Sequence, residues 1–136
     1  PWKILLPVAF VAFCASAAGL WDYPRRIKDA PCAIIACGEK DERLKACFDY
    51  FSWGRRLGRK WTWIELAGTG HSHSGRLDEF VREYFGAIMD KKPKRPVCEN
   101  LETGKIQPEM FARSSKTLQS YYPDEKLAKS SPHSRK

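Results

Sequence analysis

Residues 4–21 read ILLPVAFVAFCASAAGLW, an uncharged run of eighteen residues that no other part of the chain matches. Lys3 precedes the run and Asp22 follows it. As a helix, eighteen residues rise about 27 Å, close to the roughly 30 Å of a bilayer's hydrocarbon core. The run therefore predicts a transmembrane helix over residues 1–21.

A secretory signal peptide is the alternative for this run. Lys3 would be its charged leader, and Ala15, Ser16 and Ala17 resemble a cleavage site of the A-x-A type. The chain begins at Pro1, the residue that removal of an initiator methionine before a small side chain would leave on an uncleaved protein. We therefore expect a retained membrane helix, with the cleaved leader of a secreted protein as the second hypothesis.

Small side chains gather toward the end of the run. They let a second helix approach closely, which is how membrane helices commonly pack. Pro7, Ser16 and Gly19 also weaken the run as a membrane span. A helix of this kind indicates packing against the helices of other subunits, through Ala15, Ser16, Ala18 and Gly19.

Two amphipathic helices are predicted after the apolar run. In residues 39–53, Leu44, Cys47, Phe48 and Phe51 lie on one helical face. In residues 76–89 the apolar positions again follow the 3.6-residue period. We expect the two helices to pack on each other as a small extramembrane domain over residues 22–90. The apolar positions of the second helix are Leu77, Phe80, Val81, Tyr84, Phe85 and Ile88.

Four cysteines lie outside the apolar run, an even number that allows two disulfides in three connectivities. Such bridges would place this part of the chain in an oxidising compartment. Nine residues separate Cys37 from Cys47, a spacing found in helical hairpins of the mitochondrial intermembrane space. Thiols packed as small apolar side chains are the alternative. The four candidates are Cys32, Cys37, Cys47 and Cys98.

Residues 55–64 combine positive charge with tryptophan. This composition suits contact with anionic lipid headgroups, and it could also bind single-stranded nucleic acid. We favour lipid because the same chain carries a predicted membrane helix, and we do not expect nucleic acid as a partner. The candidate contacts are Arg55, Arg56, Arg59, Lys60, Trp61 and Trp63.

Residues 91–136 are predicted to form a basic, extended tail. They carry a net charge of +6 out of +8 for the whole chain, with few apolar side chains. A segment of this composition does not form its own core. We expect it to be ordered by contact with neighbouring subunits.

The sequence offers no recognisable catalytic constellation. We find no nucleophile with a base at a familiar spacing, no dinucleotide or phosphate-binding loop and no closed set of metal ligands. His71 and His73 stand in a glycine- and serine-rich stretch, and we expect both to be exposed loop histidines. No catalytic residue, metal or cofactor is predicted, and the chain is not expected to be an enzyme.

The beginning of the chain resembles the MWFE-type accessory subunit of mitochondrial respiratory complex I. The matching residues are Trp2, Ile4, Leu5 or Leu6, Pro7 and Cys14. The resemblance implies a non-catalytic subunit of the mitochondrial inner membrane that acts in assembly and stability, with other subunits as partners. The resulting fold class is mainly α: a transmembrane helix, a two-helix region and an extended tail.

Overall fold

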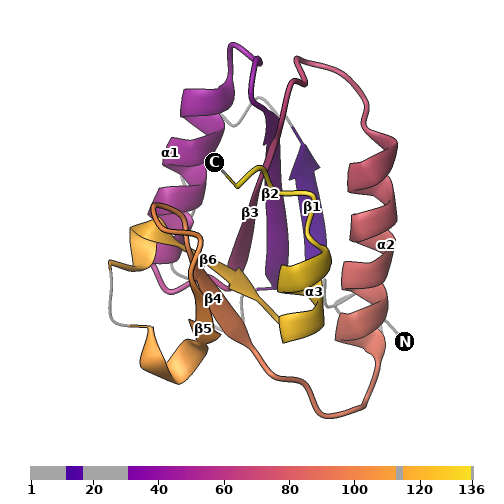
Figure 1. Cartoon of the computed structure of the whole chain (residues 1–136), viewed down its shortest axis with the longest axis vertical. Helices are drawn as coiled ribbons and strands as arrows, with labels where there is room; N and C mark the ends of the chain where they lie inside the picture. Colours follow the sequence, from indigo (N-terminus) through magenta and orange to yellow (C-terminus); the bar gives the residue numbers. More distant parts are fainter. Residues whose placement is uncertain (1–11, 17–30, 113–114, 136) are drawn as a thin grey trace, which may run out of the picture.

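The computed structural model describes residues 12–16, 31–112 and 115–135 (Figure 1). Strands β1 (Ala12–Ser16), β2 (Cys32–Gly38) and β3 (Trp61–Leu66) form a parallel sheet in the order β1-β2-β3. β2 is the central strand, and its residues Ala33 to Cys37 are at most 1% exposed. A central strand of a parallel sheet is covered on both faces, which explains why residues 32–38 are an almost unbroken apolar run.

The predicted transmembrane helix is wrong for residues 12–16, and with it the mainly α fold class. These residues form β1, which pairs with β2 from Ala12 opposite Cys32 to Ser16 opposite Ala36. Unbroken apolarity suits a strand of a parallel sheet as well as a membrane helix. Among the described residues, no helix combines the length and the apolar composition needed to cross a bilayer. Ala18, Gly19 and the residues that carry the complex I resemblance, apart from Cys14, lie outside the described part.

Helices α1 (Leu44–Arg56) and α2 (Gly75–Met89) cover opposite faces of this sheet (Figure 1). The α1 face buries Ile35, Phe51 and Trp63, whereas the α2 face buries Ile34, Phe80 and other side chains. The prediction of a helix over residues 76–89 is confirmed. Its predicted packing on the first helix is wrong, because the sheet lies between the two.

A second, antiparallel sheet follows α2. It consists of β5 (Ile106–Pro108), β4 (Val97–Asn100) and β6 (Gln119–Tyr122), in the order β5-β4-β6. Two short 3₁₀ turns, η1 (Glu109–Phe111) and η2 (Lys116–Leu118), precede β6, and helix α3 (Glu125–Ser130) follows it. The extended tail expected over residues 91–136 is therefore wrong. Several of its apolar residues, among them Val97, Tyr122 and Leu127, are buried in the core beneath α2, whereas Met110 and Phe111 are exposed.

The second half of the chain also covers the outer edge of β3. The Trp63 backbone N–H donates to Ser120 Oγ at 2.8 Å, and the Thr62 hydroxyl donates to the Tyr121 carbonyl. Further along β3, the Ser134 N–H donates to the Glu65 carbonyl at 2.8 Å. These bonds satisfy polar groups that an open sheet edge would leave unpaired, and they bring residues 131–135 beside the end of β3.

Candidate functional site

The topology indicates where a ligand site should lie. β2 and β3 are adjacent and parallel, and the helices that follow them leave toward opposite faces of the sheet. In open α/β sheets, ligands bind beyond the carboxyl ends of such strands. Here the loops at residues 39–43 and 67–74 occupy that position.

Asp41 and His71 connect these two loops. The Asp41 side chain is fully buried, and its carboxylate lies 2.9 Å from His71 Nδ1 and 2.9 Å from the Arg43 backbone N–H. The bond from the Arg43 N–H, followed by the contact with His71, lowers the pKa of Asp41. The imidazole itself is 62% exposed. His71 is thus an exposed loop histidine, as expected, but with a buried carboxylate as its partner.

The space between the two loops is closed. A Cβ atom on Gly38 would stand only 2.2 Å from the Thr69 carbonyl oxygen, so the second loop lies directly on the end of β2. The Lys40 N–H donates to the same oxygen at 2.9 Å, and the Glu39 carboxylate accepts from the Gly68 N–H at 2.8 Å. The Asp41–His71 pair therefore fastens two loops together, and the open space lies elsewhere.

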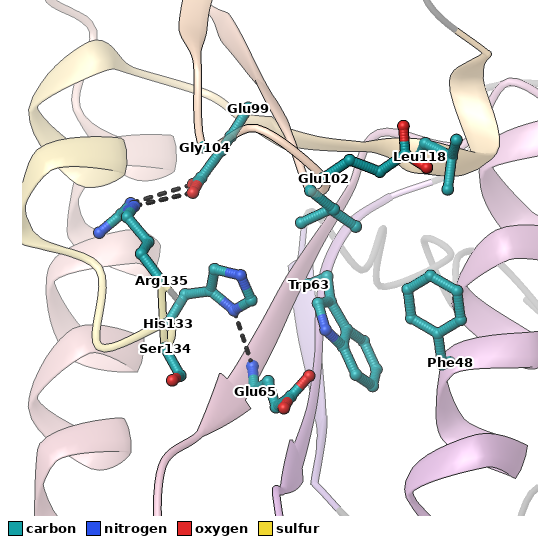
Figure 2. Close-up of a pocket in the computed structure, with 11 residues that line it drawn as sticks. Phe48, Trp63, Glu65, Glu99, Glu102, Gly104, Leu118, His133, Ser134 and Arg135 are labelled. Atoms are coloured by element: carbon teal, nitrogen blue, oxygen red, sulfur yellow. Dashed lines mark hydrogen bonds and ion pairs between the residues drawn. The ribbon is translucent and has the colours of Figure 1, made fainter.

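A cavity of about 250 Å³ opens beside the end of β3, on the side of the sheet that α1 covers (Figure 2). β3 and α1 form one side, and the turn between β4 and β5 and the segment 131–135 form the other. The cavity brings together residues that are far apart in the sequence: Phe48, Trp63, Glu65, Glu99, Leu101, Glu102, Gly104, Leu118, His133, Ser134 and Arg135.

The floor of this cavity is aromatic. Phe48 from α1 and Trp63 from β3 meet edge to face, with ring centroids 5.2 Å apart. Leu101 and Leu118 extend the apolar wall. An apolar body could lie against this surface without leaving polar groups unpaired.

The opposite side is held by a partly buried ion pair. Arg135 Nε and Nη2 donate to the two carboxylate oxygens of Glu99 at 2.7 and 3.0 Å, as Figure 2 shows. Glu99 is 1% exposed and also accepts from the Tyr122 hydroxyl at 3.2 Å. Arg135 donates further to the Ala128 carbonyl at 2.7 Å. Within the cavity the guanidinium charge is therefore cancelled by its partner.

His133 is held as a neutral imidazole. Its Nδ1 accepts the Glu65 backbone N–H at 3.0 Å, which places the ring proton on Nε2. Figure 2 shows this second nitrogen turned away from Glu65. Burial is the largest effect and lowers the pKa of His133, against the opposing charge of Glu99. His133 can thus offer a neutral N–H donor beside the cavity.

The cavity is acidic although the protein is basic. Three carboxylates and one guanidinium line it, a formal charge of −2 with His133 neutral, whereas the whole chain carries +8. Such a contrast in sign favours a positively charged ligand.

The proposed lipid-contact residues do not form one surface. Trp61 and Trp63 are 1% and 2% exposed and belong to the core beneath α1. Arg55 is also buried, and its guanidinium donates to the carbonyls of Gln119, at 2.8 Å, and Arg59. Arg59 is 8% exposed, and only Arg56 and Lys60 of the six are exposed. Arginine fixed by backbone carbonyls is a structural element here, because it satisfies acceptors that β6 and the turn after α1 leave inside the protein.

The remaining predicted sites are the residues expected to pack a membrane helix and the candidate disulfide cysteines. Ala15 is partly buried on the α1 face of the sheet, and Ser16 is exposed. Of the candidate cysteines, Cys37 and Cys47 are buried in the same core cluster beneath α1. Cys14, Cys32, Cys37, Cys47 and Cys98 are all free thiols in the structure.

Sequence reasoning missed every polar residue of the cavity. The sequence does not indicate that Glu99 is buried, because only Val97 and Cys98 of its short strand are apolar. A buried carboxylate of this kind needs a partner, but nothing in the sequence identifies Arg135 as that partner.

Within the described part of the chain, no three His, Cys, Asp or Glu side chains are grouped to hold a metal ion. No protein-family model, curated protein or solved structure matches the chain.

Proposed function

We propose that this domain binds a small organic cation, an amine or a guanidine attached to an apolar or aromatic body, in the cavity of Figure 2. The observation that carries the proposal is the acidic, aromatic lining of this cavity within a strongly basic protein. The volume of about 250 Å³ lies just below the usual range of about 300–1,000 Å³ for drug-sized ligands, so a small metabolite fits best.

The lining suggests how such a ligand would bind. The carboxylates of Glu65 and Glu102 would attract the cation, while the apolar body would lie against Phe48 and Leu118. A cation beside an aromatic face gains a further ~0.5–2 kcal/mol. His133 could donate its Nε2 proton to an acceptor on the ligand.

Matched probes test the charge preference. Phenethylamine and 3-phenylpropionate share a phenyl ring and carry opposite charges. Isothermal titration calorimetry at pH 7.5 should show the amine binding at least about tenfold more tightly, a difference of about 1.4 kcal/mol. Equal binding of the two probes, or tighter binding of the carboxylate, would refute the proposal.

Substitutions that remove one charge locate the site. Glu65→Gln and Glu102→Gln should each weaken phenethylamine binding by about threefold to tenfold, because each removes one charge near the cation. Glu79→Gln is the matched control, since Glu79 is exposed on α2, beyond the opposite face of the sheet. An equal loss in all three variants would show that the amine responds to overall charge rather than to this cavity.

Binding of this kind requires no catalysis, and the expectation that the chain is not an enzyme stays a prediction. A place in a larger assembly also stays a prediction. The membrane helix on which it was based is wrong for residues 12–16, which form β1.

A further inference from the structure

All three histidines of the chain lie in its described part, and their surroundings differ. His71 and His73 are 62% and 78% exposed, and each lies 2.9 Å from a carboxylate, that of Asp41 or Asp78. His133 instead lines the cavity and accepts a backbone N–H. Of the three histidines, only His133 accepts a hydrogen bond from the backbone, and the accepting nitrogen, Nδ1, must be unprotonated.

Two hydrogen bonds fasten residues 133–134 to the edge of β3, and both involve the backbone of Glu65. The Glu65 N–H donates to His133 Nδ1 at 3.0 Å, and the Ser134 N–H donates to the Glu65 carbonyl at 2.8 Å. A protonated imidazole carries a hydrogen on both nitrogens and accepts nothing. After protonation, the Nδ1–H of His133 and the backbone N–H of Glu65 would be two donors facing each other, and the hydrogen bond between them would be lost.

Charged groups from three parts of the fold line the cavity beside this imidazole. Glu65 lies on β3, Glu99 on β4 and Glu102 in the turn after β4, while Arg135 belongs to the same segment as His133. Glu99 is already bound at both oxygens by Arg135. Burial lowers the pKa of His133, whereas the charges of Glu99 and Glu65 act against that shift.

We propose that His133 makes the cavity sensitive to pH: its protonation breaks the bond to the Glu65 N–H, releases residues 133–134 from the edge of β3 and weakens binding of the organic cation. The part that concerns ligand affinity rests on the proposed function. The added positive charge would act in the same direction as the loss of the cavity wall. One linked proton changes affinity by at most about tenfold per pH unit.

The release is tested first without any ligand. NMR spectra of the whole chain, recorded from pH 7.5 to 4.5, would follow the ring carbons of the three histidines together with the amides of Glu65 and Ser134. The Glu65 amide should shift with the midpoint of the His133 ring, and its exchange with solvent should accelerate by about tenfold or more relative to neighbouring β3 amides. A Glu65 amide that stays unchanged while His133 titrates would overturn the proposal.

Two variants separate His133 from the other histidines. His133→Asn keeps a neutral oxygen acceptor and removes the titration, so the Glu65 amide should no longer respond to pH. In His73→Asn, the matched control, the Glu65 amide should respond to pH as it does in the wild type. The wild-type titration decides the question alone if His133→Asn does not fold. A Glu65 response that persists in a folded His133→Asn variant would contradict the assignment to His133.

The ligand experiment uses phenethylamine at pH 7.5, 6.5 and 5.5. In the wild type, the affinity for phenethylamine should decrease as the pH is lowered from 7.5 to 5.5. In His133→Asn, it should stay constant within about twofold. If phenethylamine binds at no pH, the proposed function fails, while the titration of the Glu65 amide still decides whether the segment is released. If binding occurs with the same affinity at every pH, the function stands and the pH dependence is refuted.

Discussion

Two helical glycines provide a direct test of the fold, because replacement by alanine should change stability in opposite directions. Gly54 in α1 is buried against Trp61, and a Cβ atom there would stand 2.2 Å from ring atoms Cε3 and Cζ3. Gly86 in α2 has nothing within 4 Å of the corresponding position.

The Trp61 ring has little room to move away from a new methyl group. It is 1% exposed, the Tyr50 ring stacks on it with centroids 5.1 Å apart, and the Arg59 guanidinium lies 5.7 Å from its centroid. Overpacking of this kind costs about 3 kcal/mol at the upper end of the usual range. Alanine regains about 1 kcal/mol of helix propensity. Gly54→Ala should therefore lose roughly 2 kcal/mol of unfolding free energy, while Gly86→Ala should gain up to about 1 kcal/mol.

Urea denaturation, followed by circular dichroism and by tryptophan fluorescence, measures both values. The two variants should differ by about 3 kcal/mol in unfolding free energy, with unchanged dependence on urea concentration. Equal stabilities would mean that α1 does not approach β3 as closely as described, and the packing of α1 on the sheet would have to be revised.

Three further results are expected. Glu99→Ala should lower the unfolding free energy by about 3 kcal/mol, because it leaves the partly buried Arg135 charge without its partner; a loss below ~0.5 kcal/mol would contradict this. The unfolding free energy should be constant above about pH 6.5 and decrease at lower pH, because the pKa of His133 is lower in the folded than in the unfolded state. His133→Asn should remove this pH dependence, and the same pH dependence in the variant would refute the assignment to His133. Iodoacetamide at pH 7 should leave Cys37 unmodified until the protein unfolds, because burial raises the pKa of its thiol to about 12; rapid labelling under native conditions would disprove the buried placement.

The helix over residues 76–89 could be predicted because an exposed helix shows its period directly. Leu77, Phe80 and Tyr84 are buried beneath a surface of charged side chains, and Ser74 caps the helix by accepting the Leu77 N–H. The expected first helix was correct in its apolar face, of which Cys47 and Phe51 are buried. Its start was placed too early, since the helix begins at Leu44.

The parallel sheet could not be recognised because a strand covered on both faces has no period. Residues 32–38 form such a strand, but an apolar run gives no sign of which other segment pairs with it. The same ambiguity made residues 12–16 look like part of a membrane helix. Two further residues depend on partners that are distant in the sequence. Arg55, a candidate lipid contact, binds the carbonyl of Gln119, 64 residues later. Glu99, which was not predicted as a site residue, binds Arg135, 36 residues later.

The cavity is the part that sequence reasoning could not reach at all. It exists only because residues 131–135 return to the edge of β3 and place His133 and Arg135 opposite Trp63. The chain reaches this arrangement through β4, β6 and α3, none of which was predicted from the basic composition of residues 91–136.

The most direct test is a map of amide and indole chemical shifts during a phenethylamine titration at pH 7.5. Binding in the cavity predicts saturable changes concentrated at the Trp63 indole, Glu65, Leu118 and His133, with the loop at His71 unaffected. Saturable changes centred on the Asp41–His71 pair, or no saturable change anywhere in the spectrum, would contradict the assignment of this cavity as the ligand site.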